Sequence, residues 1–167
     1  MPKNSIIENM KLKKTTIFLS LILATFFAAC SHYDELQKNP KQSTAGDDES
    51  HNTGQDCMSC HNNSSNEASG EGWWNVAGSV YNSGSPANNV TVELWTGKKG
   101  TGYKILSLVS DKKGNFYTNK IINFNGGCYA RVISGSKVED MDQIFTGNKS
   151  CSSSNCHGGT QAKIDIN

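Results

Sequence analysis

The sequence has few apolar residues and no long apolar run, and both shortages limit what the chain can be. Hydrophobic residues make up 35% of the 167 residues, and the mean hydropathy is −0.53. A chain of this composition buries only a modest core, so we expect an additional covalent or metal staple. The formal net charge is +1, without the basic excess that is typical of nucleic-acid-binding proteins, so we expect no nucleic-acid partner.

Several familiar patterns are also missing. No segment shows a sustained helical period, which argues against a helical fold. The chain contains no catalytic triad, paired-carboxylate motif, phosphate-binding loop or Gly-rich dinucleotide fingerprint. The sequence therefore gives no motif-based reason to expect an enzyme.

The N-terminus has the pattern of an export signal. Lysines at positions 11, 13 and 14 precede the apolar run Thr15–Phe27, which is too short to span a membrane comfortably. The run ends in small residues followed by Cys30, which resembles a bacterial lipoprotein signal, although phenylalanine stands where leucine is usual. We expect residues 1–29 to be a lipoprotein-type signal peptide and Cys30 to be lipidated. An ordinary secretory signal cleaved near Ala29 is the alternative.

The next segment is polar. Residues 30–54 show no apolar period and are rich in small and charged side chains, so we expect a flexible tether between the lipid and a single domain at 55–167. Without the charged residues of the export segment, 12 basic and 14 acidic residues remain, a net charge of about −2. We expect a protein of the bacterial cell envelope, anchored to the outer membrane on its periplasmic or surface side, where thiols do not stay reduced by default.

From Trp73 onward the sequence has the texture of a β protein. Apolar residues alternate with polar ones in short runs separated by turn residues, and several such runs indicate an antiparallel sandwich or small barrel. We expect a mainly β fold, a small antiparallel β-sandwich with its core at about 73–134, flanked by irregular segments. The expected strands are Asn75–Tyr81, Val90–Trp95, Tyr103–Val109, Phe116–Thr118 and Cys128–Ile133. A short helix is predicted at Val138–Phe145.

Three segments carry a resemblance to a known type of sandwich. They are Val76–Tyr81, Val90–Leu94 and Ser110–Tyr117, the last with the pattern Asp-x-x-Gly-x-Phe. This region of about 60 residues resembles the transthyretin-like or carboxypeptidase-regulatory β-sandwich. Such sandwiches are scaffolds, so the resemblance implies a fold and no chemistry.

The most specific motif of the chain is a C-x-x-C-H pentapeptide at residues 57–61. It resembles the haem-attachment site of c-type cytochromes. The resemblance implies that Cys57 and Cys60 form thioethers to one haem and that His61 is the proximal iron ligand. A Cys57–Cys60 disulfide or half of a zinc site are the alternatives, but a disulfide does not explain the histidine in the next position.

A second group has the same ending with a longer spacer. Cys151 and Cys156 are separated by four residues, and His157 follows directly. Multihaem cytochromes include such spacers, so the resemblance implies a second haem at these three residues. The small residues between and after the cysteines would let the backbone lie close to a porphyrin. A disulfide from Cys151 to either Cys156 or Cys128 is the main competitor.

The cysteine count does not choose between these readings. With Cys30 lipidated, five thiols remain, and every pairing leaves one over; two haems leave Cys128. A tetrahedral zinc site is a further alternative, although thiolate ligands compete with disulfide formation in an oxidising compartment. The four thiols of such a site would be Cys57, Cys60, Cys151 and Cys156, with His61 or His157 able to replace one.

The distal iron ligands have two candidates. Met141 precedes the second group by ten residues and is the preferred distal ligand, with His51 as the second choice. Met58 lies inside the first motif and is badly placed to reach the far side of the same haem. Core packing for Met141 and a solvated position for His51 are the alternatives.

Together these patterns predict an exported, lipid-anchored c-type cytochrome with one or two covalently bound haems. We expect one-electron transfer at the cell envelope, with the membrane and other redox proteins as partners. About 115 residues follow the tether and leave little room for a substrate pocket, so we expect an electron carrier rather than an enzyme. The alternative is a non-redox surface lipoprotein, a disulfide- or zinc-stapled sandwich that binds a partner protein or glycan.

Overall fold

The computed structural model describes residues 38–62, 72–147, 149–159 and 161–167. The chain divides into two units, and the second, Pro40–Asn167, contains almost all of the described residues. The expected signal peptide, Cys30 and the first part of the expected tether lie outside the described residues. Within the described ranges, no helix is long and apolar enough to cross a membrane.

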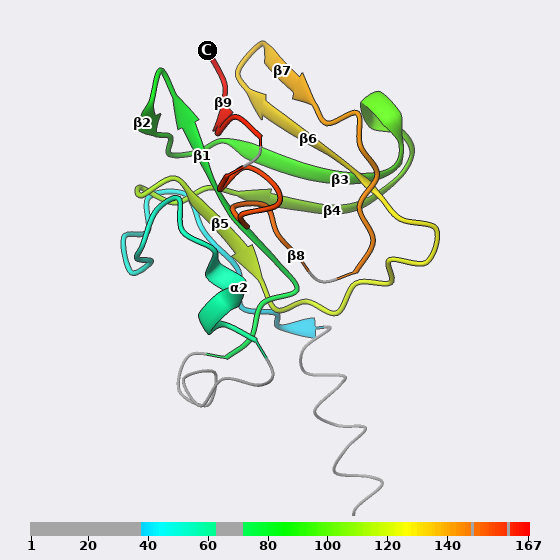
Figure 1. The fold of residues 1–167 in the computed structure, drawn as a ribbon, viewed down its shortest axis with the longest axis horizontal. Helices are drawn as coiled ribbons and strands as arrows, with labels where there is room; N and C mark the ends of the chain where they lie inside the picture. The colour runs from blue at the N-terminus through cyan, green and yellow to red at the C-terminus, as the bar shows by residue number, and fades with distance from the viewer. Residues whose placement is uncertain (1–37, 63–71, 148, 160) are drawn as a thin grey trace, which may run out of the picture. The chain divides into compact units, whose positions relative to one another are not determined.

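The domain consists of two β-sheets (Figure 1). In the five-stranded sheet, β1 (Val76–Asn82) is central; it pairs antiparallel with β2 (Ser85–Pro86) and β5 (Asn115–Thr118), and parallel with β8 (Lys149–Ser150) and β9 (Ile164–Asp165). The four-stranded sheet is antiparallel in the order β4 (Thr101–Val109), β3 (Thr91–Gly97), β6 (Tyr129–Ser134), β7 (Lys137–Asp140). The complete helical elements within the described residues are α2 (Cys57–Cys60) and η1 (Lys98–Gly100).

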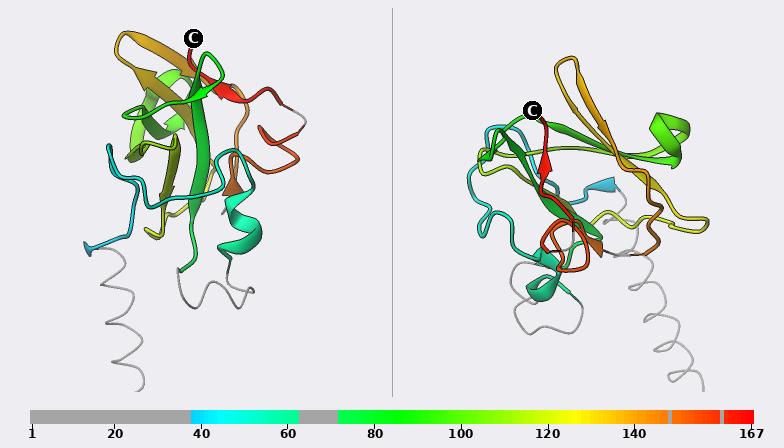
Figure 2. Two further views of the ribbon diagram at one scale, coloured as in Figure 1. Left: turned by 90° about the vertical axis from the view of Figure 1, so that its left-hand side faces the viewer. Right: turned by 45° about the horizontal axis from the view of Figure 1, so that its top comes forward.

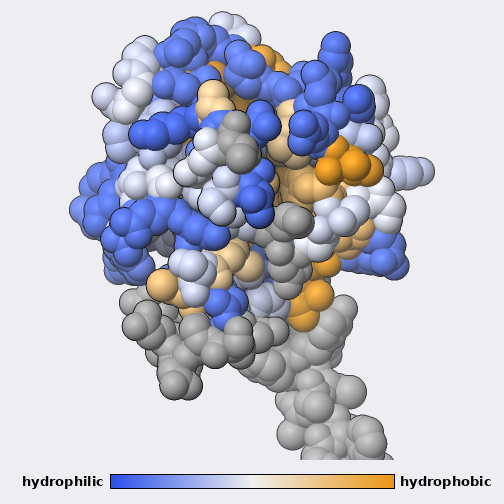
Figure 3. Space-filling view, in the orientation of Figure 1, coloured by the Kyte–Doolittle hydropathy of each residue, from blue (hydrophilic) through white to orange (hydrophobic). Residues whose placement is uncertain are grey.

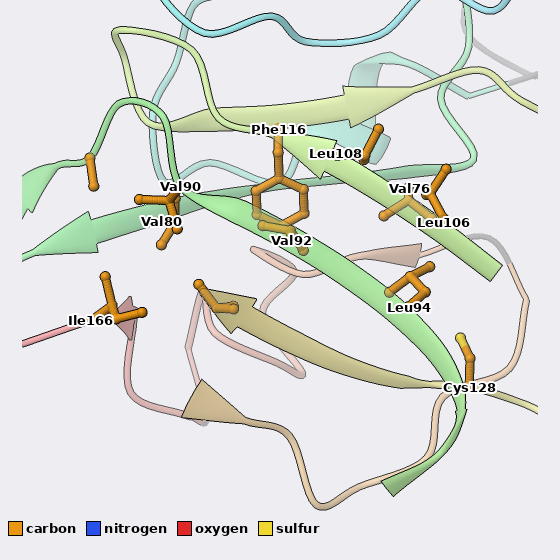
Figure 4. Packing of buried hydrophobic residues seen from close by; sticks show 12 residues of the cluster. Val76, Val80, Val90, Val92, Leu94, Leu106, Leu108, Phe116, Cys128 and Ile166 are labelled. Atoms are coloured by element: carbon orange, nitrogen blue, oxygen red, sulfur yellow. The ribbon is translucent and has the colours of Figure 1, made fainter. Parts of the chain in front are cut away.

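The core lies between the two sheets (Figures 2 and 4). Because side chains alternate along a strand, every second residue of β1, β3 and β4 points inward. Phe116, at the centre of the core, is fully buried (Figure 4). The core residues of the first sheet include Val76, Val80 and Phe116, and those of the second include Val92, Leu94, Leu106, Leu108 and Val132. The face seen in Figure 3 is mostly hydrophilic, with apolar patches between charged and polar side chains. The prediction of a mainly β fold with two sheets is confirmed.

The helix predicted at Val138–Phe145 is wrong. Residues 137–140 form strand β7, which pairs with β6 in a hairpin, and Phe145 forms an isolated bridge with Cys128. The register pairs Ser134 with Lys137, which leaves a two-residue turn whose first residue, Gly135, has φ +59°. A glycine at this position suits the tight turns that match the twist of a β-hairpin.

The C-terminal segment closes the open edge of the first sheet. Cys151 N donates to Ala77 O at 2.8 Å, and Ile166 N donates to Tyr81 O at 2.9 Å. The Ile166 side chain is fully buried in the core. Residues 150–151 and 164–166 therefore run along β1, which fixes Cys151 of the second cysteine group against the sheet.

Residues 40–54, which the sequence assigned to a tether, are part of the folded domain. Gln42 bridges to Thr118, Ser43 N donates to Tyr117 O at 3.0 Å, and Lys112 N donates to Asp47 O at 2.8 Å. Strand β5 is the edge of its sheet, and an edge strand presents unpaired backbone groups. The polar segment satisfies these groups, so the domain begins at Pro40 rather than at residue 55.

Candidate functional site

The first cysteine group forms a single helical turn. The Asp56 side chain caps it by accepting a hydrogen bond from Met58 N at 3.1 Å. The turn ends at His61, whose N–H donates to Cys57 O at 2.9 Å. Residues three and four apart are neighbours on a helix surface. The turn therefore presents Cys57, Cys60 and His61 together.

The His61 ring is buried and oriented. The residue is 9% exposed, and its Nδ1 lies 3.0 Å from Gly72 O. A carbonyl oxygen only accepts, so Nδ1 carries the proton and the lone pair of the neutral ring is on Nε2. This hydrogen bond to a backbone carbonyl is the arrangement that fixes the tautomer of metal-binding histidines. The ring also lies beside Trp74, with 5.2 Å between centroids.

The first group opens onto a cavity of about 190 Å³ on the outer face of the five-stranded sheet. His51 lines it too, with its ring centroid 5.8 Å from that of His61. Asn115 holds this part of the chain, because its Nδ2 donates to His51 O at 3.0 Å. The backbone of His51 therefore belongs to the folded domain rather than to a tether, while its side chain is exposed, as the alternative of a solvated position has it. The cavity wall includes His51, Cys57, Cys60, His61, Trp74 and Tyr117.

The second cysteine group is a compact turn rather than a helix. Cys156 N donates to Ser153 O at 2.9 Å, and His157 N donates to Cys151 O at 3.0 Å. A Cβ added at Gly158 would collide with the Ser152 carbonyl, so only glycine allows this close approach. The four-residue spacer is thus accommodated by a tight backbone turn that brings His157 back to Cys151.

A second cavity, of about 180 Å³, lies beside this turn, between the end of β7 and the C-terminal segment. Met141, Cys151 and His157 all line it, whereas Cys156 does not. His157 Nδ1 contacts the Ala162 carbonyl, the same kind of partner that His61 has. The structure therefore brings the expected distal ligand Met141 to the second group and not to the first. The apolar part of the wall includes Phe116, Val132 and Ile166.

The two cavities lie on opposite faces of one sheet. Along β5, Asn115 and Tyr117 line the first cavity, and Phe116 between them lines the second. Because successive side chains of a strand point to opposite faces, one sheet layer separates the cavities. Helix α2 also lies close to β8, so the two cysteine groups approach each other from distant parts of the chain.

Burial favours the protonated form of Cys57, Cys128 and Cys151. Desolvation by burial raises the pKa of Cys57 from 9.0 to about 11, that of Cys128 to about 11 and that of Cys151 to about 12. Cys57, Cys128, Cys151 and Cys156 are present as thiols, so the disulfide from Cys151 to Cys156 or Cys128 is not formed. Among the described residues, no three His, Cys, Asp or Glu side chains converge as a metal-binding group. The four-cysteine zinc alternative is therefore not assembled here.

Each cavity fits a porphyrin only in part. Volumes of about 190 and 180 Å³ are below the range of about 300–1,000 Å³ that encloses small-molecule ligands. A porphyrin attached at either group would therefore keep an exposed edge. The donor set of the first group suits haem, because Cys57, Cys60 and His61 line one cavity and the His61 Nδ1 faces a backbone carbonyl. The second group has the same residue types and an equally oriented histidine, but only Cys151 and His157 of its three residues line the cavity.

Sequence reasoning did not point to two residues that shape the first site. Gly72 supplies the carbonyl for His61, and Tyr117 forms an aromatic wall with Trp74, their ring centroids 4.6 Å apart. The Trp73–Trp74 pair offered a signal for an aromatic wall, but nothing in the spacing indicated Gly72 or Asn115.

Comparison with known proteins gave no match: no family model, no curated protein and no solved structure is similar to this chain. The assignment of the site therefore rests on the residues and geometry described above.

Proposed function

We propose that this protein is a lipid-anchored c-type cytochrome that transfers single electrons at the bacterial cell envelope. One observation carries the proposal: a single helical turn presents Cys57, Cys60 and His61, and the carbonyl of Gly72 orients the buried imidazole. A disulfide staple needs only the two thiols. The buried and oriented histidine is what a haem-attachment site needs in addition.

The residues of the chain have distinct roles in this function. A bound haem supplies an iron that gains or loses one electron. Cys57 and Cys60 would hold the group covalently, and His61, whose orientation is fixed by Gly72 O, would bind its iron. Trp74 packs against the His61 ring and limits its movement. A ligand held this firmly changes little between the two oxidation states.

The same proposal extends to a second haem at Cys151, Cys156 and His157. Three features support it. Cys151 and His157 line one cavity, and the Nδ1 of His157 contacts the Ala162 carbonyl as that of His61 does with Gly72. The turn at Gly158 also lets the backbone pack tightly beside the cavity.

The proposed partners follow from the same features. A lipid on Cys30, which lies outside the described residues, would attach the protein to the outer membrane on its periplasmic or surface side. The small cavities would leave a haem edge exposed at each site, and an exposed edge is the place where another redox protein approaches. We propose an electron carrier without a substrate of its own.

The test is covalent haem in protein from a host that performs cytochrome c maturation. The purified protein should show Soret and α bands that survive acid–acetone extraction. Replacing Cys57 and Cys60 by alanine should remove the first haem, and replacing Cys151 and Cys156 should remove the second. Cys128→Ala is the matched control, because this buried thiol lies in the core and lines neither cavity. A folded but colourless protein would instead favour the non-redox surface lipoprotein.

A further inference from the structure

We propose that the two haems have different distal ligands, His51 at the first and Met141 at the second, and that the second site therefore has the higher reduction potential. The inference rests on the proposed function. It assigns each distal candidate to one site and predicts the direction in which an electron moves between them.

His51 lies beside His61 in the first cavity. The two ring centroids are 5.8 Å apart, and both rings line the first cavity. A group bound in this cavity would therefore lie within reach of both imidazoles.

The position of His51 is fixed by the strands rather than by chance contact. Asn115, which is 3% exposed at the start of β5, donates to Ser50 Oγ at 2.9 Å and to His51 O at 3.0 Å. The neighbouring Gly54 N donates to Ser79 Oγ on β1 at 2.8 Å. The loop that carries His51 is therefore anchored to β1 and β5 on both sides of the residue.

Met141 is placed at the other site. It follows β7 directly, and its N–H donates to Ala130 O at 2.9 Å, which fixes the backbone beside β6. Its side chain lines the second cavity together with that of His157. Met58, the other methionine in the described part of the chain, lines neither cavity.

The difference between the sites lies on the distal side. Both proximal histidines have Nδ1 at a backbone carbonyl, so their basicity is tuned alike. A methionine ligand raises the potential of a haem relative to a second histidine. One electron would then leave the ferrous first iron, which becomes ferric, and reduce the ferric second iron to ferrous, without any proton transfer. The electron crosses the single sheet layer that contains β5.

The experiment is spectroscopy of the oxidised holoprotein and of two variants. The wild type should show one bis-imidazole low-spin signal and one sulfur-to-iron band, each from one of its two haems. Met141→Ala should abolish the band and lower the upper midpoint in a potentiometric titration. His51→Ala should turn the first haem high-spin while keeping the band, and added imidazole should restore the low-spin signal.

Controls separate this inference from the proposed function. Met58→Ala and the exposed Asp48→Ala should leave all signals unchanged. Identical ligand signatures for the two haems of the wild type would overturn the inference even if neither variant folds, as would a sulfur band that persists in Met141→Ala. An unchanged low-spin signal in His51→Ala would do the same. Absence of covalent haem in the wild type would refute the proposed function itself.

Discussion

Replacing Asn115 by alanine should loosen the segment that carries His51 and lower the stability of the domain. The Asn115 side chain makes three hydrogen bonds while only 3% of the residue is exposed: its Nδ2 donates to Ser50 Oγ and His51 O, and its Oδ1 accepts from Ser79 Oγ at 2.6 Å. The net contribution of each such bond is about 1 kcal/mol, and a buried donor that loses its acceptor costs about 1–3 kcal/mol. We expect the free energy of unfolding to fall by about 2–4 kcal/mol.

The assay is urea denaturation combined with amide hydrogen exchange. Two hydrogen bonds join the 40–54 segment to the rest of the domain: Gly54 N donates to Ser79 Oγ, and Lys112 N donates to Asp47 O. Both N–H groups should exchange faster in the variant than in the wild type. Asn88→Ala is the matched control, because the Asn88 Oδ1 accepts one exposed bond from Gly46 N in the same segment. We expect its cost to stay below about 1 kcal/mol. An equal loss of unfolding free energy in the two variants, with unchanged amide exchange at Gly54 and Lys112, would refute the role of Asn115 in anchoring this segment.

Three further changes test other parts of the account. Gly78→Ala should lower the free energy of unfolding by about 1–3 kcal/mol in urea denaturation, because the added Cβ would lie 2.6 Å from Phe116 Cζ and 2.8 Å from the Cβ of Cys151. Adding Phe116→Leu to this variant should recover part of the lost stability. Effects of the two substitutions that simply add would contradict the predicted clash. Without haem, stability should be full below pH 9.0 and fall as the pH rises toward about 12, since the unfolded chain ionises at 9.0 while burial holds the pKa of Cys57 and Cys128 at about 11 and that of Cys151 at about 12. Thioether formation removes the protons of Cys57 and Cys151 but not that of Cys128, so the holoprotein should lose less stability in this range. A holoprotein with the same alkaline loss would count against attachment at Cys57 and Cys151. Asp56→Ala should destabilise the turn by about 0.5–2 kcal/mol by removing its cap, and unchanged exchange of its amides would argue against that role.

The sandwich strands could be predicted because their signals are local. The alternation of Val90, Val92 and Leu94 fixes which face is buried, and all three residues lie in the core. The turn chemistry around Asp111 and Gly114 also gives β5 its start, since the Asp111 carboxylate accepts from Asn115 N at 3.0 Å. Such patterns depend on neighbours within a few residues.

The remaining features depend on contacts between distant residues. Strands β8 and β9 are two residues long, and their parallel pairing with β1 leaves no pattern in the sequence. The segment 40–54 is polar, and only the edge of β5 gives it a folded position. The grouping of Met141 with His157, and of His51 with His61, likewise follows from the packing of the sheets.

The most direct test of the central claim is the number of haems covalently bound to each polypeptide. The protein would be purified from a maturation-competent host, extracted with acid–acetone and weighed by intact mass spectrometry, with iron content measured in parallel. The expected mass is that of the mature lipidated chain plus two haems, with two irons per chain. A mass with one haem would refute the second haem site. A folded protein whose mass contains no haem would contradict the account.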